Sequence, residues 1–395
     1  MPTEELLKFA PRPTGAGDMF QLLRDGQPRT RADLAAITGQ ARSTIAARID
    51  LLMASGLIAP AGEASSTGGR PPVTFAFSPG ARIVLAVDLG ATHARLAVTD
   101  LASNVLAEVD APLAISDGPE NVLAWVAETG EKLIATTGRD LKDLVSVGVG
   151  LPGPVEHSTG RPINPPIMPA WDDVDVPAIL KRTFDASVLV DNDVNIMALG
   201  EHRTAWPGVS DLLFVKVATG IGAGVISDGE LRRGAQGAAG DIGHIAVPNA
   251  TDTPCRCGNI GCLEAVASGQ AIAGALKKEG LEAANSGDVV SLVRGGDLMA
   301  SHAVRQAGRD IGAVLAACVS LLNPSMIVVG GVIADAGEHL IAGIREIVYQ
   351  RSLPLATQHL RIVTSQARGQ AGVLGASAMA IDHVLSPAAI DALIA

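Results

Sequence analysis

Apolar residues recur at helical spacing in three short segments near the start of the chain. The segments GDMFQLLRDG, TRADLAAITG and ARSTIAARIDLLMASG each predict a short helix with one apolar face. Thr30 is suited to cap the second helix, and a glycine ends both the second and the third. The apolar positions of the first and third helices are Met19, Phe20, Leu22, Leu23, Ile45, Ile49, Leu52 and Met53.

A tight turn between the second and third helices predicts a helix-turn-helix, whose third helix would read DNA bases. The next stretch, LIAPAGEASSTGGRPPVTFAFS, predicts a wing of two strands around a Gly/Ser-rich tip, with Val73, Phe75 and Phe77 alternating along the second strand. The alternative is a small helical docking module with a solvated face. The residues expected to contact DNA are Gln40, Arg42, Ser43, Thr44 and Arg48 on the third helix and its turn, and Arg70 on the wing.

From residue 82 onward the pattern changes to consecutive strands. RIVLAVDLGATHARLAVTDLASNVLAEVDAPL predicts three consecutive strands with a glycine turn after Asp88, and LLFVKVATGIGAGVISDG repeats the arrangement of strand, glycine turn and strand later in the chain. NPSMIVVGGVIADAGEHLI predicts a buried strand, two glycines and a helix. Such turns let backbone N–H groups approach an anion, and an adjacent Asp could hold Mg²⁺; alternatively, the glycines only make tight turns. The candidate nucleotide-binding residues are Asp88, Gly90, Thr92, Thr219, Gly220, Gly222 and Gly330.

Composition and charge narrow the class of protein. With 395 residues, 48% hydrophobic and 18% charged, the chain should form two or three globular domains. It shows neither a long apolar run nor an export signal at its start, so we expect a cytoplasmic protein without a membrane partner. Residues 1–80 carry a net charge of +1 and the remainder −12, so nucleic acid should meet the first eighty residues.

Three of the four cysteines lie within eight residues. In a reducing compartment such a cluster is better suited to metal binding than to disulfides. Cys255, Cys257 and Cys262 together with His244 supply three thiolates and one imidazole, a complete tetrahedral ligand set without an open position. This set predicts a structural Zn²⁺ site. The alternative is a cluster of small buried cysteines, which is the expectation for Cys318.

Five motifs together resemble the ROK family, named for repressors, open reading frames and kinases. They are DLGAT, GVGLPGPV, DNDVNIMALGE, GIGAGVISDGELRRGAQGAAGDIGH and CRCGNIGCLE, and the resemblance runs from about residue 82 to 384. It implies an α/β fold of two actin-like, sugar-kinase (ribonuclease H-like) lobes behind an N-terminal winged helix-turn-helix. The expected domains are 1–80 for the DNA-binding head, 81–193 with 372–395 for the first lobe, and 194–371 for the second lobe with the zinc loop.

The resemblance also implies roles for individual residues. In ROK kinases the residue matching His244 binds zinc through one ring nitrogen and faces a sugar hydroxyl with the other, and the residue matching Asp193 is the general base. The local sequence equally allows Asp193 to be a helix-capping residue. The sugar-binding residues implied are Asn192, Asp193, Asp241, His244 and Glu264.

Three departures from the kinase pattern place phosphoryl transfer in question more than ligand binding. Ala91 stands where the kinases have glycine, His93 where lysine is common, and Asp241 where the family has the longer glutamate. We therefore predict a sugar-responsive transcriptional regulator that binds operator DNA as a homodimer or homotetramer. The alternative is an ATP-dependent sugar kinase, using ATP and Mg²⁺, with an appended DNA-binding domain.

Overall fold

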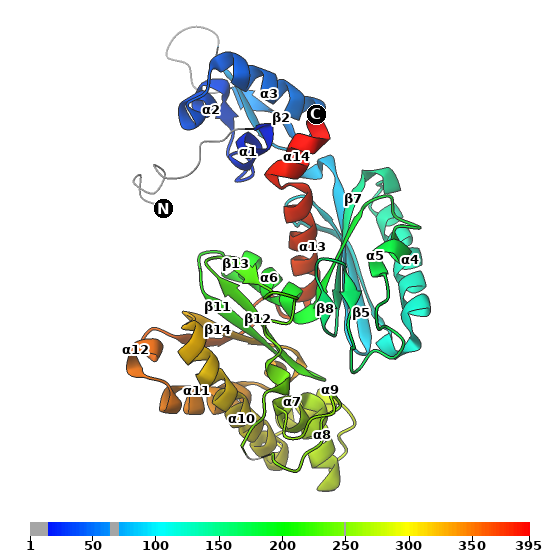
Figure 1. Ribbon diagram of the computed structural model, residues 1–395, viewed down its shortest axis with the longest axis vertical. Helices are drawn as coiled ribbons and strands as arrows, with labels where there is room; N and C mark the ends of the chain where they lie inside the picture. Colours follow the sequence, from blue (N-terminus) through cyan, green and yellow to red (C-terminus); the bar gives the residue numbers. More distant parts are fainter. Residues whose placement is uncertain (1–14, 64–70, 249) are drawn as a thin grey trace.

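The computed structural model describes residues 15–63, 71–248 and 250–395, and Arg70 lies outside these residues. Three bodies follow one another along the long axis (Figure 1). A small head lies at one end, a first α/β lobe adjoins it, and a second α/β lobe lies at the other end. This is the predicted fold class. The domain boundaries given above remain predictions.

The head has the predicted helix-turn-helix and two strands of the predicted wing. Thr30 caps the second helix by accepting a hydrogen bond from the Asp33 N–H, and Gly39 ends it with a φ of 70°. Three residues then lead to the third helix. The elements are α1 Ala16–Gln21, α2 Arg31–Thr38, α3 Arg42–Ala54, β1 Arg29–Thr30, β2 Ile58–Glu63 and β3 Val73–Phe77, with the strands in the antiparallel order β1-β3-β2.

Two details of the predicted head pattern are wrong. Met53 is 38% exposed, because it lies at the edge of the apolar face of α3, one position past the fully buried Leu52 and turned away from it around the helix. Val73 is 39% exposed, because it pairs with Glu63 at the outer end of the wing, beyond the helices. Ile45, Ile49 and Leu52 are fully buried, as predicted.

The first lobe is built on a five-stranded sheet in the order β10-β7-β4-β5-β6. β4 pairs antiparallel with β5 and parallel with β7, so one strand joins the hairpin to the parallel half. All seven residues of β4 are buried, as expected for a central strand covered on both faces. The strands are β4 Ile83–Leu89, β5 His93–Asp100, β6 Val105–Pro112, β7 Leu144–Leu151 and β10 Ser187–Asn192.

The second lobe repeats this topology. Its sheet has the order β13-β12-β11-β14-β15, in which the first strand in sequence again pairs antiparallel on one side and parallel on the other. Two sheets with the same order of strands match the predicted pair of related lobes. The strands are β11 Leu212–Val217, β12 Ile221–Ser227, β13 Glu230–Arg232, β14 Met326–Gly330 and β15 Arg361–Thr364.

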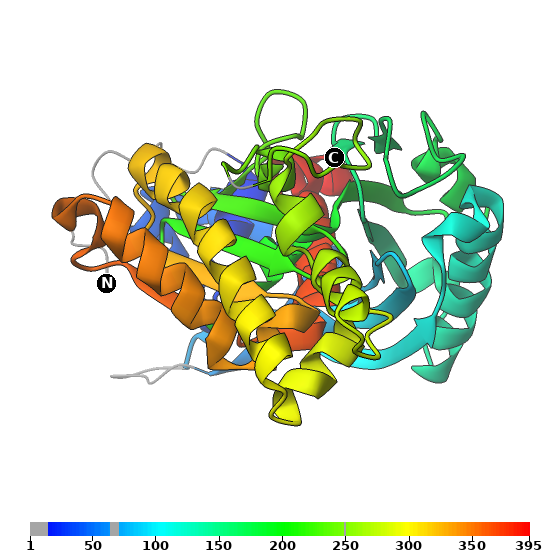
Figure 2. The ribbon, with the colours of Figure 1, turned by 90° about the horizontal axis from the view of Figure 1, so that it is seen from below.

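Helices cover the sheets and join the lobes (Figures 1 and 2). α4 and α5 pack on the first sheet, α6 and α13 lie between the sheets, and α7 to α11 pack on the second. The helices are α4 Pro119–Thr136, α5 Val176–Leu180, α6 Asp193–Ala205, α7 Leu263–Ala267, α8 Gly269–Lys278, α9 Ser286–Arg294, α10 Leu298–Leu322, α11 Glu338–Arg351, α12 Pro354–Thr357, α13 Ala371–Val384 and α14 Pro387–Ile394.

The backbones of α6 and α13 touch, and glycine makes this possible. A Cβ atom on Gly375 would lie 1.6 Å from the carbonyl oxygen of Ile196, and one on Gly200 would lie 2.0 Å from that of Ala371. No side chain fits at either position. The two helices must therefore move together or slide along each other, since side chains do not separate them.

No single helix among the described residues is both long and apolar enough to cross a bilayer. Arg368–Val384 and Pro387–Ile394 reach the necessary length only as a pair, with a 53° bend between them.

Candidate functional site

The predicted zinc ligands converge. The ligand atoms of His244, Cys255, Cys257 and Cys262 all lie within 4.8 Å of one another. Cys257 Sγ is 3.7 Å from Cys262 Sγ, and two sulfurs on one tetrahedral zinc ion stand about 3.8 Å apart. His244 Nδ1 lies 3.6 Å from Cys255 Sγ. Three thiols and one imidazole at this spacing fit Zn²⁺ in a closed, structural site.

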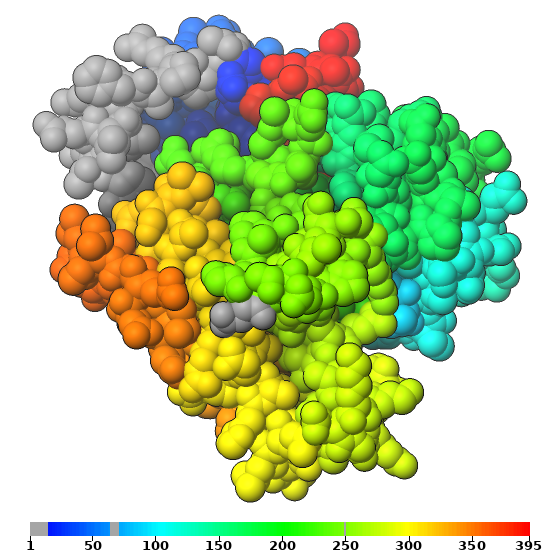
Figure 3. Space-filling model, turned by 60° about the horizontal axis from the view of Figure 1, so that its bottom comes forward, coloured from blue at the N-terminus to red at the C-terminus, as the bar shows by residue number. Residues whose placement is uncertain are grey.

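A folded-back loop presents the cysteines. The N–H of Cys255 donates to the carbonyl of Asn259 at 2.8 Å, and Gly258 turns the chain with a φ of 94°. Cys262 then occupies the N-cap position of α7, without a hydrogen bond from its side chain to the helix. Figure 3 shows the segment around residues 240–265 at the surface of the second lobe. Because most residues of this loop are exposed, apolar packing does little to hold it.

The segment before His244 is packed too closely to move freely. A Cβ atom on Gly240 would lie 1.9 Å from the carbonyl oxygen of Ala223, and one on Gly237 would lie 2.4 Å from that of Val155. The segment ends in a short 3₁₀ turn, Ile242–His244. There the Nε2 atom of His244 is 4.0 Å from a carboxylate oxygen of Asp241. One ring nitrogen of His244 thus faces the cysteines and the other faces Asp241.

Lys216 lies among three of the carboxylates singled out from the sequence. Its ammonium group forms an ion pair with Asp193, and the side chains of the pair are 17% and 5% exposed. Burial alone would lower the pKa of Lys216, but the charges of Asp193, Asp88 and Glu264 outweigh it and raise that pKa above its ordinary value. Burial raises the pKa of Asp88, and the charge of Lys216 only partly offsets this. Lys216 therefore supplies the positive charge among these carboxylates.

Asn192 caps α6, so the capping role considered for Asp193 belongs to its neighbour. The side-chain oxygen of Asn192 accepts hydrogen bonds from the N–H groups of Val194 and Asn195, and its amide nitrogen donates to the carbonyl of Gly153 at 2.9 Å. Asp193 is the first residue of the helix and is 3% exposed. Its carboxylate is thereby left to pair with Lys216.

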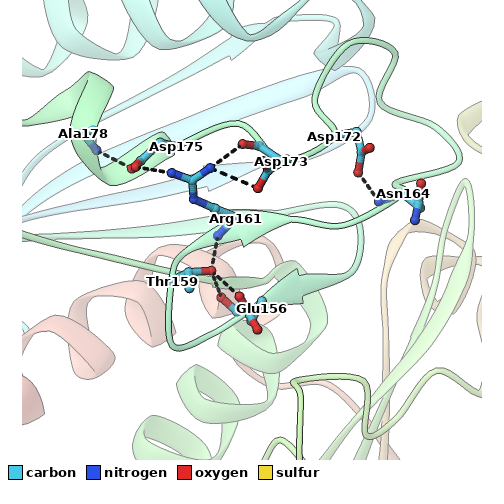
Figure 4. Close-up of polar contacts among 8 residues, drawn as sticks. All are labelled: Glu156, Thr159, Arg161, Asn164, Asp172, Asp173, Asp175 and Ala178. Carbon is cyan, nitrogen blue, oxygen red and sulfur yellow. Dashed lines mark hydrogen bonds and ion pairs between the residues drawn. The ribbon is translucent and has the colours of Figure 1, made fainter.

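The segment containing Gly153 is held in place by a cluster of ion pairs. Figure 4 shows the guanidinium of Arg161 between Asp173 and Asp175, at 3.0 and 2.6 Å. Asp175 also caps α5, by accepting a hydrogen bond from the Ala178 N–H at 2.9 Å. The loop after β7 is thereby tied to the first lobe beside Asn192.

Glu264 connects the cysteine-containing loop to the second glycine turn. Its carboxylate accepts a hydrogen bond from the N–H of Ile221 at 3.0 Å, and a Cβ atom on Gly220 would lie 2.5 Å from it. Thr219, in the same turn, is half-buried. The candidate sugar residue Glu264 and this candidate phosphate turn are therefore in direct contact.

The other glycines of the candidate nucleotide site are engaged by packing. A Cβ atom on Gly222 would lie 3.0 Å from Val194, and one on Gly330 would lie 2.6 Å from the ring of Phe214. In the first turn, the ring of His93 lies against Gly90, where a Cβ atom would be 2.3 Å from His93 Cε1; Thr92 beside it is exposed. With a lysine cation next to Asp88 and an imidazole against Gly90, these residues are a poor fit to Mg²⁺ and ATP.

A buried ion pair that the sequence analysis did not identify lies near the sugar residues. Asp191, only 1% exposed, accepts from Arg233 Nε at 2.6 Å and from Asn195 Nδ2 at 2.8 Å. Arg233 lies at the start of the segment that leads to Asp241, so the pair ties that segment to the end of β10. The Nδ1 atom of His157 lies 3.6 Å from a carboxylate oxygen of Asp191. Burial lowers the pKa of His157, and the positive charge of Arg233 lowers it further.

The start of α3 presents an exposed polar surface. Arg42, Ser43 and Thr44 are all exposed at its first turn, while Ile45 behind them is buried in the head. Arg48, half-buried on the same helix, donates a hydrogen bond to the side-chain oxygen of Gln40. A helix end of this kind can enter a major groove without disturbing the core of the head.

Two site residues that were not predicted, Lys216 and Asp191, have a recognisable signal in the sequence. Lys216 is the only charged residue in the apolar strand LLFVKV, and a charge inside such a run indicates a buried partner. Asp191 likewise follows the apolar run SVLV. Their partners could not be identified, because each lies more than twenty residues away along the chain.

Comparisons with known proteins show which relatives match the lobes alone and which match the head as well. Residues 84–383 match the ROK family. The xylose repressor of Caldicellulosiruptor bescii is 29% identical over 382 residues, covering 93% of this chain and 95% of the repressor. The crystal structure of a ROK family transcriptional regulator, a homologue of the E. coli Mlc protein, covers 96% of this chain and 98% of its own, with a TM-score of 0.81 and 27% identity.

A glucokinase is similar over a smaller share of the chain. The ROK family glucokinase of Streptomyces griseus, crystallised with glucose and AMPPNP, has a TM-score of 0.65 at 27% identity and covers 75% of this chain and 99% of its own. The kinase match thus leaves about a quarter of this chain without a counterpart, whereas the regulator matches nearly all of it.

Proposed function

The chain belongs to the ROK family, and on that premise we propose that it is a sugar-responsive, DNA-binding transcriptional regulator. The observation that carries the proposal is the head. Its helix-turn-helix, with Arg42, Ser43 and Thr44 exposed, precedes lobes that hold candidate sugar residues beside a cluster of candidate zinc ligands. We further propose that it acts in the cytoplasm as a homodimer or homotetramer, because two half-sites of an operator require two heads.

In this proposal the sugar binds between the lobes. Asp193, Asp241, His244 and Glu264, with Asn192 at the start of α6, would accept or donate hydrogen bonds to its hydroxyls. The Cys255, Cys257 and Cys262 thiolates with His244 would hold Zn²⁺, and the ion would fix the plane and tautomer of the His244 ring. Lys216 would balance the charge of Asp193 in the absence of a metal–nucleotide complex.

A ligand screen tests the proposal most directly. Purified protein is heated with each of a panel of monosaccharides and sugar phosphates, with and without ATP and Mg²⁺, and the melting temperature is recorded. At least one sugar should raise it, and the same sugar should change the affinity for an operator duplex selected from a random pool by the protein itself. No stabilising sugar and no selected duplex would refute the proposal.

Substitution of Arg42 by alanine should weaken operator binding by about 1–3 kcal/mol and reduce its salt dependence, because Arg42 is exposed at the end of α3 expected to face DNA. The measurement is fluorescence anisotropy over a range of salt concentrations. Lys132→Ala, at an exposed site on α4, is the matched control. Unchanged DNA affinity in the Arg42 variant would mean that α3 is not the reading helix.

A continuous set of contacts connects Asp193, one of the proposed sugar residues, to the head. Asp193 begins α6, and Arg203 in the last turn of that helix lies 2.7 Å from Asp382 on α13. The other oxygen of Asp382 is 3.0 Å from Arg24 in the head. In α14, Asp391 accepts a hydrogen bond from the Gly17 N–H at 2.8 Å. A shift of α6 on ligand binding would therefore reach the head through one carboxylate.

Substitution of Asp382 by asparagine should reduce the coupling between sugar and operator while leaving each separate affinity nearly unchanged. Such couplings amount to about 1–3 kcal/mol, and the loss of the two ion pairs should remove most of this. Operator affinity is measured with and without saturating sugar, and Asp140→Asn on the first lobe serves as the control. Full coupling in the Asp382 variant would exclude this route.

A sugar kinase is the second candidate, favoured by the glucokinase similarity and by Asp193 at the start of α6. A coupled assay with ATP and a hexose panel distinguishes the two. Turnover that Asp193→Asn abolishes would establish catalysis. Sugar-induced stabilisation without turnover would support a sensor.

A further inference from the structure

A pocket lies at the junction of the head, the first lobe and the C-terminal helices, apart from the proposed sugar residues. Its volume is about 730 Å³, within the range of small-molecule sites. Ser55 and Leu57 line it from the head, and Leu144 and Phe184 from the first lobe. The end of α13, the turn after it and α14 contribute His383, Val384, Leu385, Ala389 and Leu393. None of the proposed sugar, zinc or nucleotide residues lines it.

The inner wall of this junction pocket is apolar. Leu57, Leu144, Phe184 and Leu385 line it and are otherwise buried in two hydrophobic cores, one of the head and one of the first lobe. Leu393 on α14 lines it as well and is 61% exposed. An apolar ligand would cover that leucine and gain free energy from the area removed from water.

The charged lining is basic, in contrast with the chain as a whole. Arg82, Lys142, Lys181 and His383 line the pocket with a single carboxylate, Asp185, although the chain carries a formal net charge of −11. Lys142 is paired with a neighbouring aspartate. Among the described residues, neither Arg82 nor Lys181 has a carboxylate within ion-pair distance. Within the described part of the chain, Arg82 and Lys181 thus line the pocket beside its apolar wall without forming an ion pair.

We propose that this junction pocket binds a small organic monoanion with an apolar body, such as a medium-chain or aromatic carboxylate. The carboxylate would meet Arg82 and Lys181, and its apolar body would lie on Leu57, Phe184 and Leu393. A sugar has no comparable apolar body. Because the pocket walls belong to the head, the first lobe and α14, a bound anion bridges all three and favours one position of the head.

The test uses the purified full chain with octanoate and benzoate, and octanamide as the uncharged match to octanoate. Calorimetry should show the carboxylates binding and octanamide binding at least tenfold more weakly. Lys181→Glu should reduce octanoate affinity by about tenfold or more, whereas Lys278→Glu, on exposed α8 of the second lobe, should leave it unchanged. Hydrogen exchange should show protection by octanoate at residues 55–57 and 383–393.

Three outcomes would overturn this proposal: no binding by either carboxylate, equal binding of octanoate and octanamide, or protection elsewhere than at the pocket walls. Binding that depends on protein concentration would identify a second copy of the chain as the occupant and would also overturn it. The proposal does not rest on the regulator function. If no sugar or operator bound while octanoate did, the regulator proposal alone would fail.

Discussion

Substitution of Cys257 by serine should remove zinc from the protein and, with it, most of the affinity for sugar. Serine does not ionise near neutral pH and is a poor zinc ligand, so the set of four loses its closed geometry. Structural zinc sites contribute about 10–16 kcal/mol of apparent binding free energy. The exposed loop around the cysteines has little apolar packing to replace that contribution.

The effect on sugar follows from His244, which belongs to both the zinc ligands and the proposed sugar residues. Without the metal its ring is no longer held, and we expect sugar affinity to fall by about ten- to a hundredfold. Zinc is measured by mass spectrometry of the purified protein, and sugar affinity by calorimetry. Cys318→Ser, in α10 away from the cluster, is the matched control and should keep both its zinc and its affinity for sugar. A zinc-free Cys257 variant with unaltered sugar affinity would contradict the positioning role.

Substitution of Lys216 by methionine should lower the free energy of unfolding by about 3–5 kcal/mol. Methionine keeps the length of the side chain but removes the charge, which leaves Asp193 buried without its ion-pair partner. Removing one partner of a buried ion pair lowers the free energy of unfolding far more than replacing both partners with neutral residues. The double variant Lys216→Met with Asp193→Asn should therefore regain most of the lost stability.

Urea denaturation with tryptophan fluorescence measures both variants, and Lys132→Met serves as the control. Lys132 forms its ion pair with Glu128 on the exposed face of α4, where water screens such pairs and they contribute little to stability. A Lys216 variant as stable as the control would show that water reaches the pair. A double variant no more stable than the single one would show that Lys216 acts through packing rather than charge.

The head could be predicted almost completely from the sequence because its elements depend on near neighbours. Thr30 caps α2 from within its own first turn, and Gly39 ends that helix through its own φ angle. The buried positions of α3 follow from a spacing of three or four residues. Met53, at the edge of the apolar face of α3, and Val73, at the outer end of the wing, were mispredicted, because burial at such positions depends on the neighbouring elements.

The cysteine cluster could also be predicted, since three ligands lie within eight residues and few arrangements of so short a loop keep them apart. The glycines were harder to interpret. The same pattern suits a phosphate turn and a close packing contact, and the contacts of Gly222 and Gly330 with Val194 and Phe214 became apparent only in the folded chain.

The sequence by itself therefore determined the order of head and lobes, the family resemblance and the candidate metal ligands. Tertiary structure decided which charges meet: Lys216 with Asp193, Arg233 with Asp191, and Arg24 with Asp382, a pair 358 residues apart. Local pattern follows from backbone geometry and burial, which act over a few residues. The pairing of charges depends on the whole path of the chain, because any of its many acids could have met each of these cations.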